Sequence, residues 1–191
     1  MTEIEKETAS PLPAYFDKYP DVKAKLIDYL KTIPREEKQK NVENFKKYLN
    51  GEMTWGELRH ITKRMQREIA RVAYLKFQMK DYAGADTLFK GLAITDHTNW
   101  YYRAALGAIY QKQKMYEDAV AEYTVALGLK ENEISCLVNR GECFMWLGRL
   151  EEARVDCNVA VQAQVAAGNP WQMRSKILVK RIEMLEKGEG K

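Results

Sequence analysis

The chain has 191 residues, of which 46% are hydrophobic and 30% are charged, and its formal net charge is +4. That length suits one compact unit or one short solenoid, and the composition permits both a core and a soluble surface. The mild, mixed charge gives no reason to expect nucleic acid, and no stretch approaches the roughly 20 apolar residues that cross a bilayer. The polar, acidic run at 1–10 is unlike a secretory signal, so we expect a cytoplasmic protein that does not enter a membrane.

The first part of the chain predicts an irregular start followed by short helices. Three prolines in or directly after 1–19 discourage regular structure, so we expect that segment to be mobile. Of the two helices that follow, the first is capped by Asp21 and ended by Pro34, and the second ends at Asn50-Gly51. The apolar faces that we expect to point inward carry Val22, Leu26, Leu30 and Ile33 in the first helix and Val42, Phe45 and Leu49 in the second.

A capping box marks the start of a third, short helix, because Thr54 is followed three residues later by Glu57. A longer helix begins near Thr62 and continues into a repeated region. The apolar faces of the N-terminal helices need a partner. We expect them either to fold back on the rest of the chain or to meet a second copy in a homodimer.

A repeat with a period of about 34 residues follows. Ala85, Ala119 and Ala153 stand at equal intervals along the chain, and Gly107 and Gly141 keep the same interval. Small residues at fixed spacing suit places where two helices approach closely, and larger residues fill the space between them. The small slots are Ala73, Gly107 and Gly141, then Ala85, Ala119 and Ala153; the large ones are Tyr110, Phe144, Phe89 and Tyr123; and Tyr82, Tyr116 and Leu150 open the second helix of each pair.

The period and its slots resemble the tetratricopeptide repeat (TPR), which has two helices per unit. The resemblance implies an all-α fold, a right-handed superhelix of three TPR helix pairs. Asn169 and Pro170 predict the start of a capping helix, with Asn169 as N-cap. Its apolar face covers the last repeat and carries Trp171, Leu178, Ile182 and Leu185. The expected parts are a mobile segment at 1–19, an N-terminal helical region at 20–65, repeats at 66–99, 100–133 and 134–167, a capping helix at 168–187 and a tail at 188–191.

A narrower resemblance begins at the lead-in to the repeats. The run reads Gly51, Thr54, Leu58, Ile61, Met65, Ile69, Ala73 and Tyr74. It resembles the class II translocator chaperones of bacterial type III secretion, over roughly residues 49–165. Leu92 in the first repeat, and Asp96 with Asn99 in the link to the second, also fit that family. The resemblance implies a chaperone that holds an apolar partner segment extended in a concave groove and keeps it from aggregating or associating early.

The repeat spacing also predicts which side chains face the groove. The stripe on the first helices consists of Arg67, Ala70, Tyr74, Phe77, Tyr101, Ala104, Ala108, Gln111, Ser135, Val138, Glu142 and Met145, with Trp146 beside it. Small residues in the middle leave depth, and aromatic residues and Met are favoured at interface hot spots. We expect Tyr74, Phe77, Tyr101 and Val138 to carry much of the affinity for a protein partner. Alternatively, some of the aromatic residues pack inside the fold or under the N-terminal helices.

No combination of residues predicts catalysis, a cofactor or a metal site. His60 and His97 have no Cys or Asp partner at motif spacing, and we expect both on the surface. Cys136, Cys143 and Cys157 contain no Cys-x-x-Cys pair, so small buried hydrophobic residues with free thiols are the better interpretation. No glycine spacing matches a phosphate-binding loop. We therefore expect a protein that is not an enzyme.

A basic stripe of Arg64, Arg67 and Arg71 lies ahead of the first repeat. Glu68 interrupts it, and we expect no exposed aromatic residue to be interleaved with it, as single-strand binding would require. A solvated face, or a charge that steers an acidic protein partner, is favoured over nucleic acid.

Two other protein-binding roles compete with the secretion chaperone. The TPR co-chaperones of heat-shock proteins bind a C-terminal carboxylate with Lys and Asn, whereas the corresponding positions here hold Ala70, Tyr74, Ala104 and Ala108. That branch is therefore disfavoured. The remaining alternative is a TPR scaffold or adaptor that links folded regulatory or motility proteins, and the identity of the partner distinguishes it from the chaperone.

Overall fold

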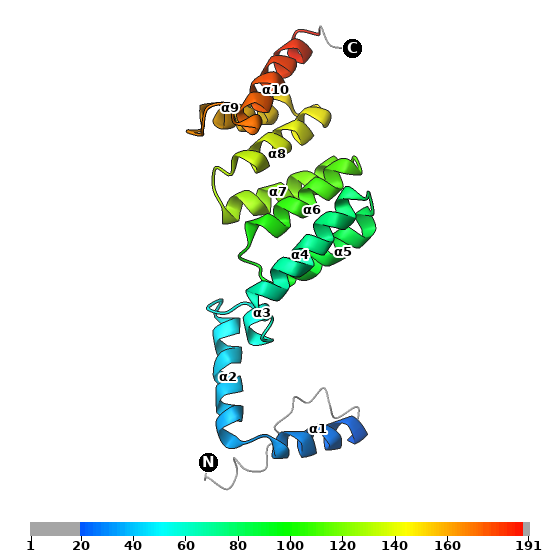
Figure 1. Cartoon of the computed structure of the whole chain (residues 1–191), viewed down its shortest axis with the longest axis vertical. Coiled ribbons are helices and arrows are strands. Elements are labelled where there is room, and N and C mark those ends of the chain that lie inside the picture. Colours follow the sequence, from blue (N-terminus) through cyan, green and yellow to red (C-terminus); the bar gives the residue numbers. More distant parts are fainter. Residues whose placement is uncertain (1–19, 189–191) are drawn as a thin grey trace. The chain divides into compact units, whose positions relative to one another are not determined.

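A computed structural model of the chain describes residues 20–188, and over that range every regular element is an α-helix. The expectation for 1–19 and most of that for the tail lie outside the described residues. The helices are α1 (Pro20–Thr32), α2 (Arg35–Leu49), α3 (Trp55–Leu58), α4 (Lys63–Gln78), α5 (Tyr82–Thr95), α6 (Trp100–Lys112), α7 (Tyr116–Leu129), α8 (Ile134–Trp146), α9 (Leu150–Gln162) and α10 (Pro170–Glu186), as Figure 1 shows. The predicted all-α fold is confirmed. The chain divides into two compact units between Met53 and Thr54.

The first unit contains α1 and α2, which Pro34 separates as predicted. Asp21 lies in the first turn of α1 rather than at its N-cap. The inward face predicted for α2 is wrong: Val42, Phe45 and Leu49 are 56%, 47% and 66% exposed. These apolar residues occur only once per turn along an otherwise highly charged helix, which buries none of its residues. That this face folds back on the rest of the chain or meets a second copy stays a prediction.

The second unit begins with the predicted capping box. The Glu57 backbone N–H donates to Thr54 Oγ1 at 3.2 Å, and the Thr54 backbone N–H donates to Glu57 Oε2 at 2.8 Å. Helix α3 then packs against α5. Thr62 caps α4 through a hydrogen bond from the Met65 backbone N–H at 3.2 Å. These caps fix where the chain enters the repeated helices.

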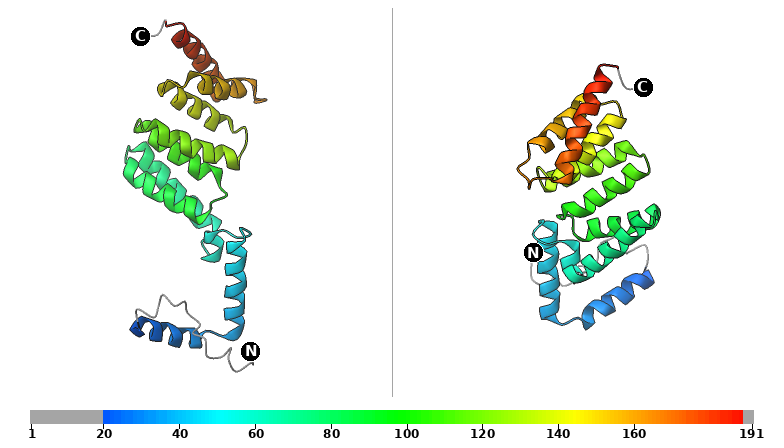
Figure 2. Two further views of the ribbon diagram at one scale, coloured as in Figure 1. Left: turned by 180° about the vertical axis from the view of Figure 1, so that it is seen from behind. Right: turned by 45° about the horizontal axis from the view of Figure 1, so that its top comes forward.

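Helices α4 to α10 form a stack in which each helix contacts the next (Figure 2). The pairs α4/α5, α6/α7 and α8/α9 repeat one design, and Tyr82, Tyr116 and Leu150 open the second helix of each, as predicted. The turn inside each pair contains a left-handed residue at the same slot. These residues are Lys80, Lys114 and Gly148, with φ of 64°, 63° and 75°.

The small-residue slots predicted from the period are confirmed. Ala73, Ala85, Ala119 and Ala153 are 0% exposed. A Cβ on Gly107 would lie 2.9 Å from the ring of Tyr123, and one on Gly141 would lie 2.8 Å from Cys157 Sγ. Both glycines therefore sit where the next helix leaves no room for a side chain. The core that forms around these slots falls into two clusters, one on α4 to α6 and the other on α7 to α10.

Helix α10 closes the stack against α8 and α9. Its predicted N-cap is confirmed, since Asn169 Oδ1 accepts hydrogen bonds from the backbone N–H groups of Trp171 at 3.0 Å and Gln172 at 3.2 Å. Leu178 and Ile182 are buried in the core, with 5% and 0% exposure. The last repeat therefore has the apolar cover that a solenoid requires.

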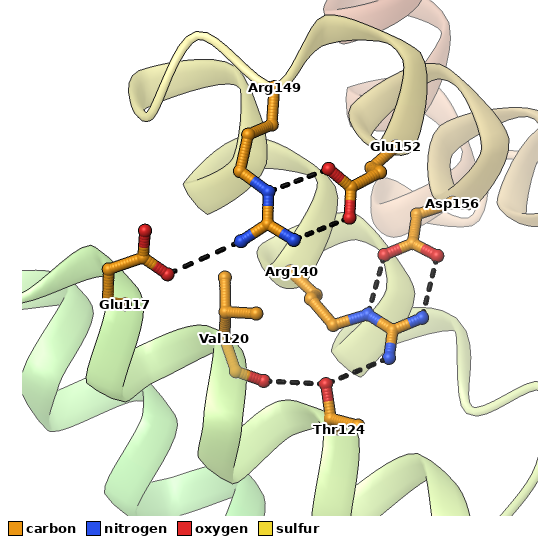
Figure 3. Close-up of polar contacts among 7 residues, drawn as sticks. All are labelled: Glu117, Val120, Thr124, Arg140, Arg149, Glu152 and Asp156. Atoms are coloured by element: carbon orange, nitrogen blue, oxygen red, sulfur yellow. Dashed lines mark hydrogen bonds and ion pairs between the residues drawn. The ribbon is translucent and has the colours of Figure 1, made fainter.

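A charged residue replaces an apolar one in the third repeat. Arg140 stands one repeat period after Leu106, which is buried. Figure 3 shows the Arg140 guanidinium donating to both carboxylate oxygens of Asp156, at 2.7 and 2.8 Å, and to Thr124 Oγ1 at 3.0 Å. Thr124 in turn donates to the Val120 carbonyl at 2.8 Å. One side chain thus joins α7, α8 and α9.

Candidate protein-binding groove

The first helices of the three pairs, together with α10, line an open cleft of about 270 Å³. Its walls are mainly aromatic and its floor contains small residues. The lining residues are Tyr74, Phe77, Phe89, Trp100, Tyr101, Ala104, Ala105, Ala108, Tyr123, Ser135, Cys136, Asn139 and Trp171. The cleft therefore includes Tyr74, Phe77, Tyr101, Ala104, Ala108 and Ser135 from the stripe that the repeat spacing predicted.

Exposed aromatic rings form the wall at the α4 and α6 end. Tyr74 and Tyr101 are 47% and 41% exposed. The Tyr74 ring stacks near Phe77 at a centroid distance of 6.5 Å, and the Tyr101 ring meets Phe89 edge-on at 6.2 Å. Burial raises the pKa of Tyr101, and the neighbouring Tyr74 raises it further, so its hydroxyl stays neutral at physiological pH. These rings offer apolar surface without bringing charge into the cleft.

A second cleft, of about 470 Å³, adjoins the first and shares Tyr74 and Tyr101 with it. Its lining is more polar because α4 contributes two arginines. The residues around it are Arg67, Ala70, Arg71, Tyr74, Asn99, Tyr101 and Tyr102. The predicted stripe residues Arg67 and Ala70 therefore border a basic extension of the groove rather than its apolar part.

A hydrogen-bonded network occupies the α8 and α10 side. Glu142 Oε2 accepts hydrogen bonds from Gln111 Nε2 and Arg174 Nη2, both at 2.5 Å. Arg174 Nη1 also donates to Asn139 Oδ1 at 3.4 Å, and Tyr123 Oη donates to Gln111 Oε1 at 2.9 Å. The repeat spacing predicts that Gln111 and Glu142 face a partner. Both are half-buried and hydrogen-bonded to each other, and Glu142 is also paired with Arg174 of α10, so the negative charge on this side is balanced. Their contact with a partner stays a prediction.

Three residues of the predicted stripe lie elsewhere. Val138 and Met145 are 0% and 5% exposed, because they belong to the core cluster on α7 to α10, and neither can contact a partner from the surface. Trp146 is 52% exposed but lies outside the lining of both clefts. Its ring stacks on Tyr116 at 6.1 Å. The expectation that Val138 anchors a partner is therefore wrong.

The structure adds lining residues that the repeat spacing did not identify. Trp171 comes from the capping helix, which lies outside the repeat, so the repeat period cannot predict its position. Arg174 of the same helix lines neither cleft but donates to Glu142. The three-residue spacing of Trp171 and Arg174, continued to Leu178, would have shown that they share a helix face. Trp100 and Asn139 belong to the repeats but occupy slots next to the predicted stripe.

The thiols and histidines lie as predicted. Cys136, Cys143 and Cys157 are free and buried. Burial raises the pKa of these thiols to about 11, about 12 and about 12, so they remain protonated at neutral pH. His60 and His97 are exposed. Within residues 20–188, no three His, Cys, Asp or Glu side chains are grouped to hold a metal ion, and no helix is long and apolar enough to cross a membrane.

No protein-family model matches the chain. Rat sperm-associated antigen 1 is 33% identical over 69 residues, which are 36% of this chain and 8% of the relative. The chain thus spans only a small part of the curated relative's length.

A type III secretion (T3SS) complex from Aeromonas hydrophila matches 75% of this chain and 97% of its own, with a TM-score of 0.68 and 19% identity. The Yersinia enterocolitica type III secretion chaperone SycD, solved with a peptide of the translocator YopD, matches 66% and 98%, with a TM-score of 0.60 and 22% identity. This chain has the TPR-like helical fold of those two structures.

Proposed function

We propose that the chain is a chaperone of the type III secretion kind, which holds an extended segment of a partner protein in its groove. The observation that carries this proposal is the cleft between α4, α6, α8 and α10. Exposed tyrosines form its wall, and Ala104 and Ala108, one helical turn apart, leave depth in its floor. This geometry suits an unfolded segment that inserts a few apolar side chains.

The structural neighbours support this direction. SycD matches two thirds of this chain, and its structure was solved with a peptide of a translocator. We extend that mode of binding to this chain: the partner is a secreted protein whose apolar segment would associate too early if left free. The groove binds and does not catalyse, and the complex forms in the cytoplasm before secretion.

Site-specific photo-crosslinking in the native cells tests this proposal. A photoreactive phenylalanine analogue replaces Ala108 in the cleft or, as a matched control, Ala121 on the exposed surface of α7. The cross-linked peptides are then identified by mass spectrometry. We expect Ala108 to capture one contiguous apolar segment of a secreted, membrane-active protein, and Ala121 not to capture it.

Two results would contradict the proposal. If Ala108 captures the surface of a folded regulatory domain, the protein is a scaffold rather than a chaperone. If both positions capture the same proteins with equal yield, the cleft does not select the partner.

A further inference from the structure

Two arginines lie at groove-facing positions of the first repeat. Arg67 stands one repeat period before Tyr101 and two before Ser135, and both of those residues line the apolar cleft. Arg71 has the same relation to Ala105 and Asn139, which also line it. Arg67 and Arg71 themselves border the adjoining cleft, together with Tyr74 and Tyr101. The groove is therefore apolar along its middle and basic at its α4 end.

Neither guanidinium is paired with a carboxylate of residues 20–188. Within the described chain, Arg67 and Arg71 make no ion pair and no side-chain hydrogen bond, whereas Arg103, Arg140 and Arg174 each bind a carboxylate, at 3.2, 2.7 and 2.5 Å. A guanidinium cannot lose its proton in a protein, so the positive charge at this end of the groove is permanent. The opposite end differs because Glu142 already neutralises Arg174.

We infer that the bound segment carries an acidic side chain beside its apolar anchor, and that Arg67 and Arg71 bind this carboxylate. The inference rests on the proposed function and adds the chemistry of the partner. Arg71 is three residues from Tyr74 on α4, or about 4.5 Å along the helix axis. An extended chain advances about 3.3 Å per residue, so an acidic residue two to four positions from the anchor lies within reach of the arginine.

A carboxylate suits the site better than a nucleic acid backbone does. Two neighbouring guanidinium groups offer forked donors that match carboxylate geometry. The apolar cleft next to the two arginines is floored by alanines, and it accepts an apolar side chain rather than a second phosphate. Glu68, on the same helix and exposed, would repel a continuous polyanion.

Synthetic peptides test the inference on the full-length protein. Each fluorescein-labelled peptide carries a Leu-Ser-Val anchor in a Ser/Gly chain, with two glutamates placed one to five residues before or after the anchor. Its twin carries glutamines at the same positions. Affinities are measured by fluorescence anisotropy for the wild type, Arg67→Gln/Arg71→Gln, and Arg64→Gln. Arg64 is the matched control because it is exposed on the same helix but borders neither cleft.

We expect the best glutamate peptide to bind roughly tenfold more tightly than its twin, the typical gain from charge-assisted hydrogen bonds. Arg67→Gln/Arg71→Gln should abolish that preference and Arg64→Gln should retain it. Arg71→Glu should reverse the preference: a third peptide, with lysines in place of the glutamates, should bind this variant more tightly than the glutamate peptide does.

Other outcomes overturn the inference in distinguishable ways. If both twins bind equally and Tyr101→Ala weakens both, the groove function stands and the acidic partner is wrong. If no peptide binds the wild type, the proposed function fails and the inference fails with it. If a 20-nucleotide oligo-dT probe loses affinity in Arg67→Gln/Arg71→Gln while the twins bind equally, the arginines bind nucleic acid instead.

Discussion

Arg140 and Asp156 form a two-pronged ion pair between α8 and α9, with N–O distances of 2.7 and 2.8 Å (Figure 3). The side chains are 20% and 6% exposed, so both charges are largely removed from water. The corresponding slot of the second repeat holds Leu106, which is 1% exposed. An ion pair in the third repeat therefore occupies the position that an apolar side chain occupies in the second repeat.

Breaking this pair on one side should be costly. Arg140→Leu leaves the Asp156 carboxylate buried without its partner, and we expect a loss of about 3 kcal/mol in the free energy of unfolding. The double variant Arg140→Leu/Asp156→Ala removes the stranded charge and should recover part of that loss. Urea denaturation measures both. If the single variant costs no more than an ordinary surface substitution, about 0.5 kcal/mol, the pair is not structurally important.

Two glycines in helices should respond to alanine with opposite signs. At Gly141 the new Cβ would lie 2.8 Å from Cys157 Sγ, so Gly141→Ala should destabilise the third repeat by about 1–3 kcal/mol. At Gly91 nothing lies within 4 Å, and Gly91→Ala should stabilise α5 by about 0.5–1 kcal/mol through its helix propensity. Thermal melting of the two variants side by side is the measurement. Equal shifts would contradict the close packing at Gly141.

Glycine at a left-handed turn position should stabilise the folded protein. Lys114 has φ of 63° in the turn where the third repeat uses Gly148. Non-glycine residues pay a steric penalty in this region, so Lys114→Gly should raise the free energy of unfolding by about 0.5–1 kcal/mol. Ala121→Gly, exposed in the middle of α7, is the control and should lower it by a similar amount. If Lys114→Gly also destabilises the protein, that turn does not adopt the left-handed conformation in solution.

The buried thiols should resist alkylation. An ordinary thiol with a pKa of 9.0 is half thiolate at pH 9, whereas burial raises the pKa of Cys136 to about 11 and that of Cys143 to about 12. Because the thiolate is the nucleophile, iodoacetamide at pH 9 should modify the native protein far more slowly than the urea-unfolded protein. Mass spectrometry follows the time course. Equal rates in the two states would mean that the thiols are accessible.

The groove tyrosines should separate binding from folding. Tyr101 is 41% exposed, so Tyr101→Ala should leave the melting temperature nearly native. It should lower the affinity for the partner segment roughly thirtyfold, which corresponds to a loss of about 2 kcal/mol in binding free energy. Tyr123 borders the same cleft but is 1% exposed, so Tyr123→Ala should cost about 3–5 kcal/mol of stability. Collapse of the Tyr101→Ala protein, or unchanged binding by it, would count against an anchoring role.

The repeat period predicts the helix pairs and their close contacts because those depend on residues within a pair. It places Ala104 and Ala108 in the groove for the same reason. It fails at Val138 and Met145, since α7, α9 and α10 together cover more of α8 than the repeat implies.

The sequence predicts the capping helix only as an apolar lid. That Trp171 lines the cleft and Arg174 donates to Glu142 depends on the angle at which α10 crosses α8, and the repeat period does not predict that angle. The pairing of Arg140 with Asp156 likewise becomes visible only when α8 and α9 lie side by side.

Helix α10, which ends the stack, also completes the lining of the cleft. Trp171 lines the cleft, and Arg174, from the same helix, holds Glu142. A repeat inserted before α10, or a truncation that removes it, would therefore change recognition as well as stability. In many solenoids the number of repeats is free to vary. Here the last helix supplies part of the cleft itself, so the number of repeats cannot change without changing the length and lining of the cleft.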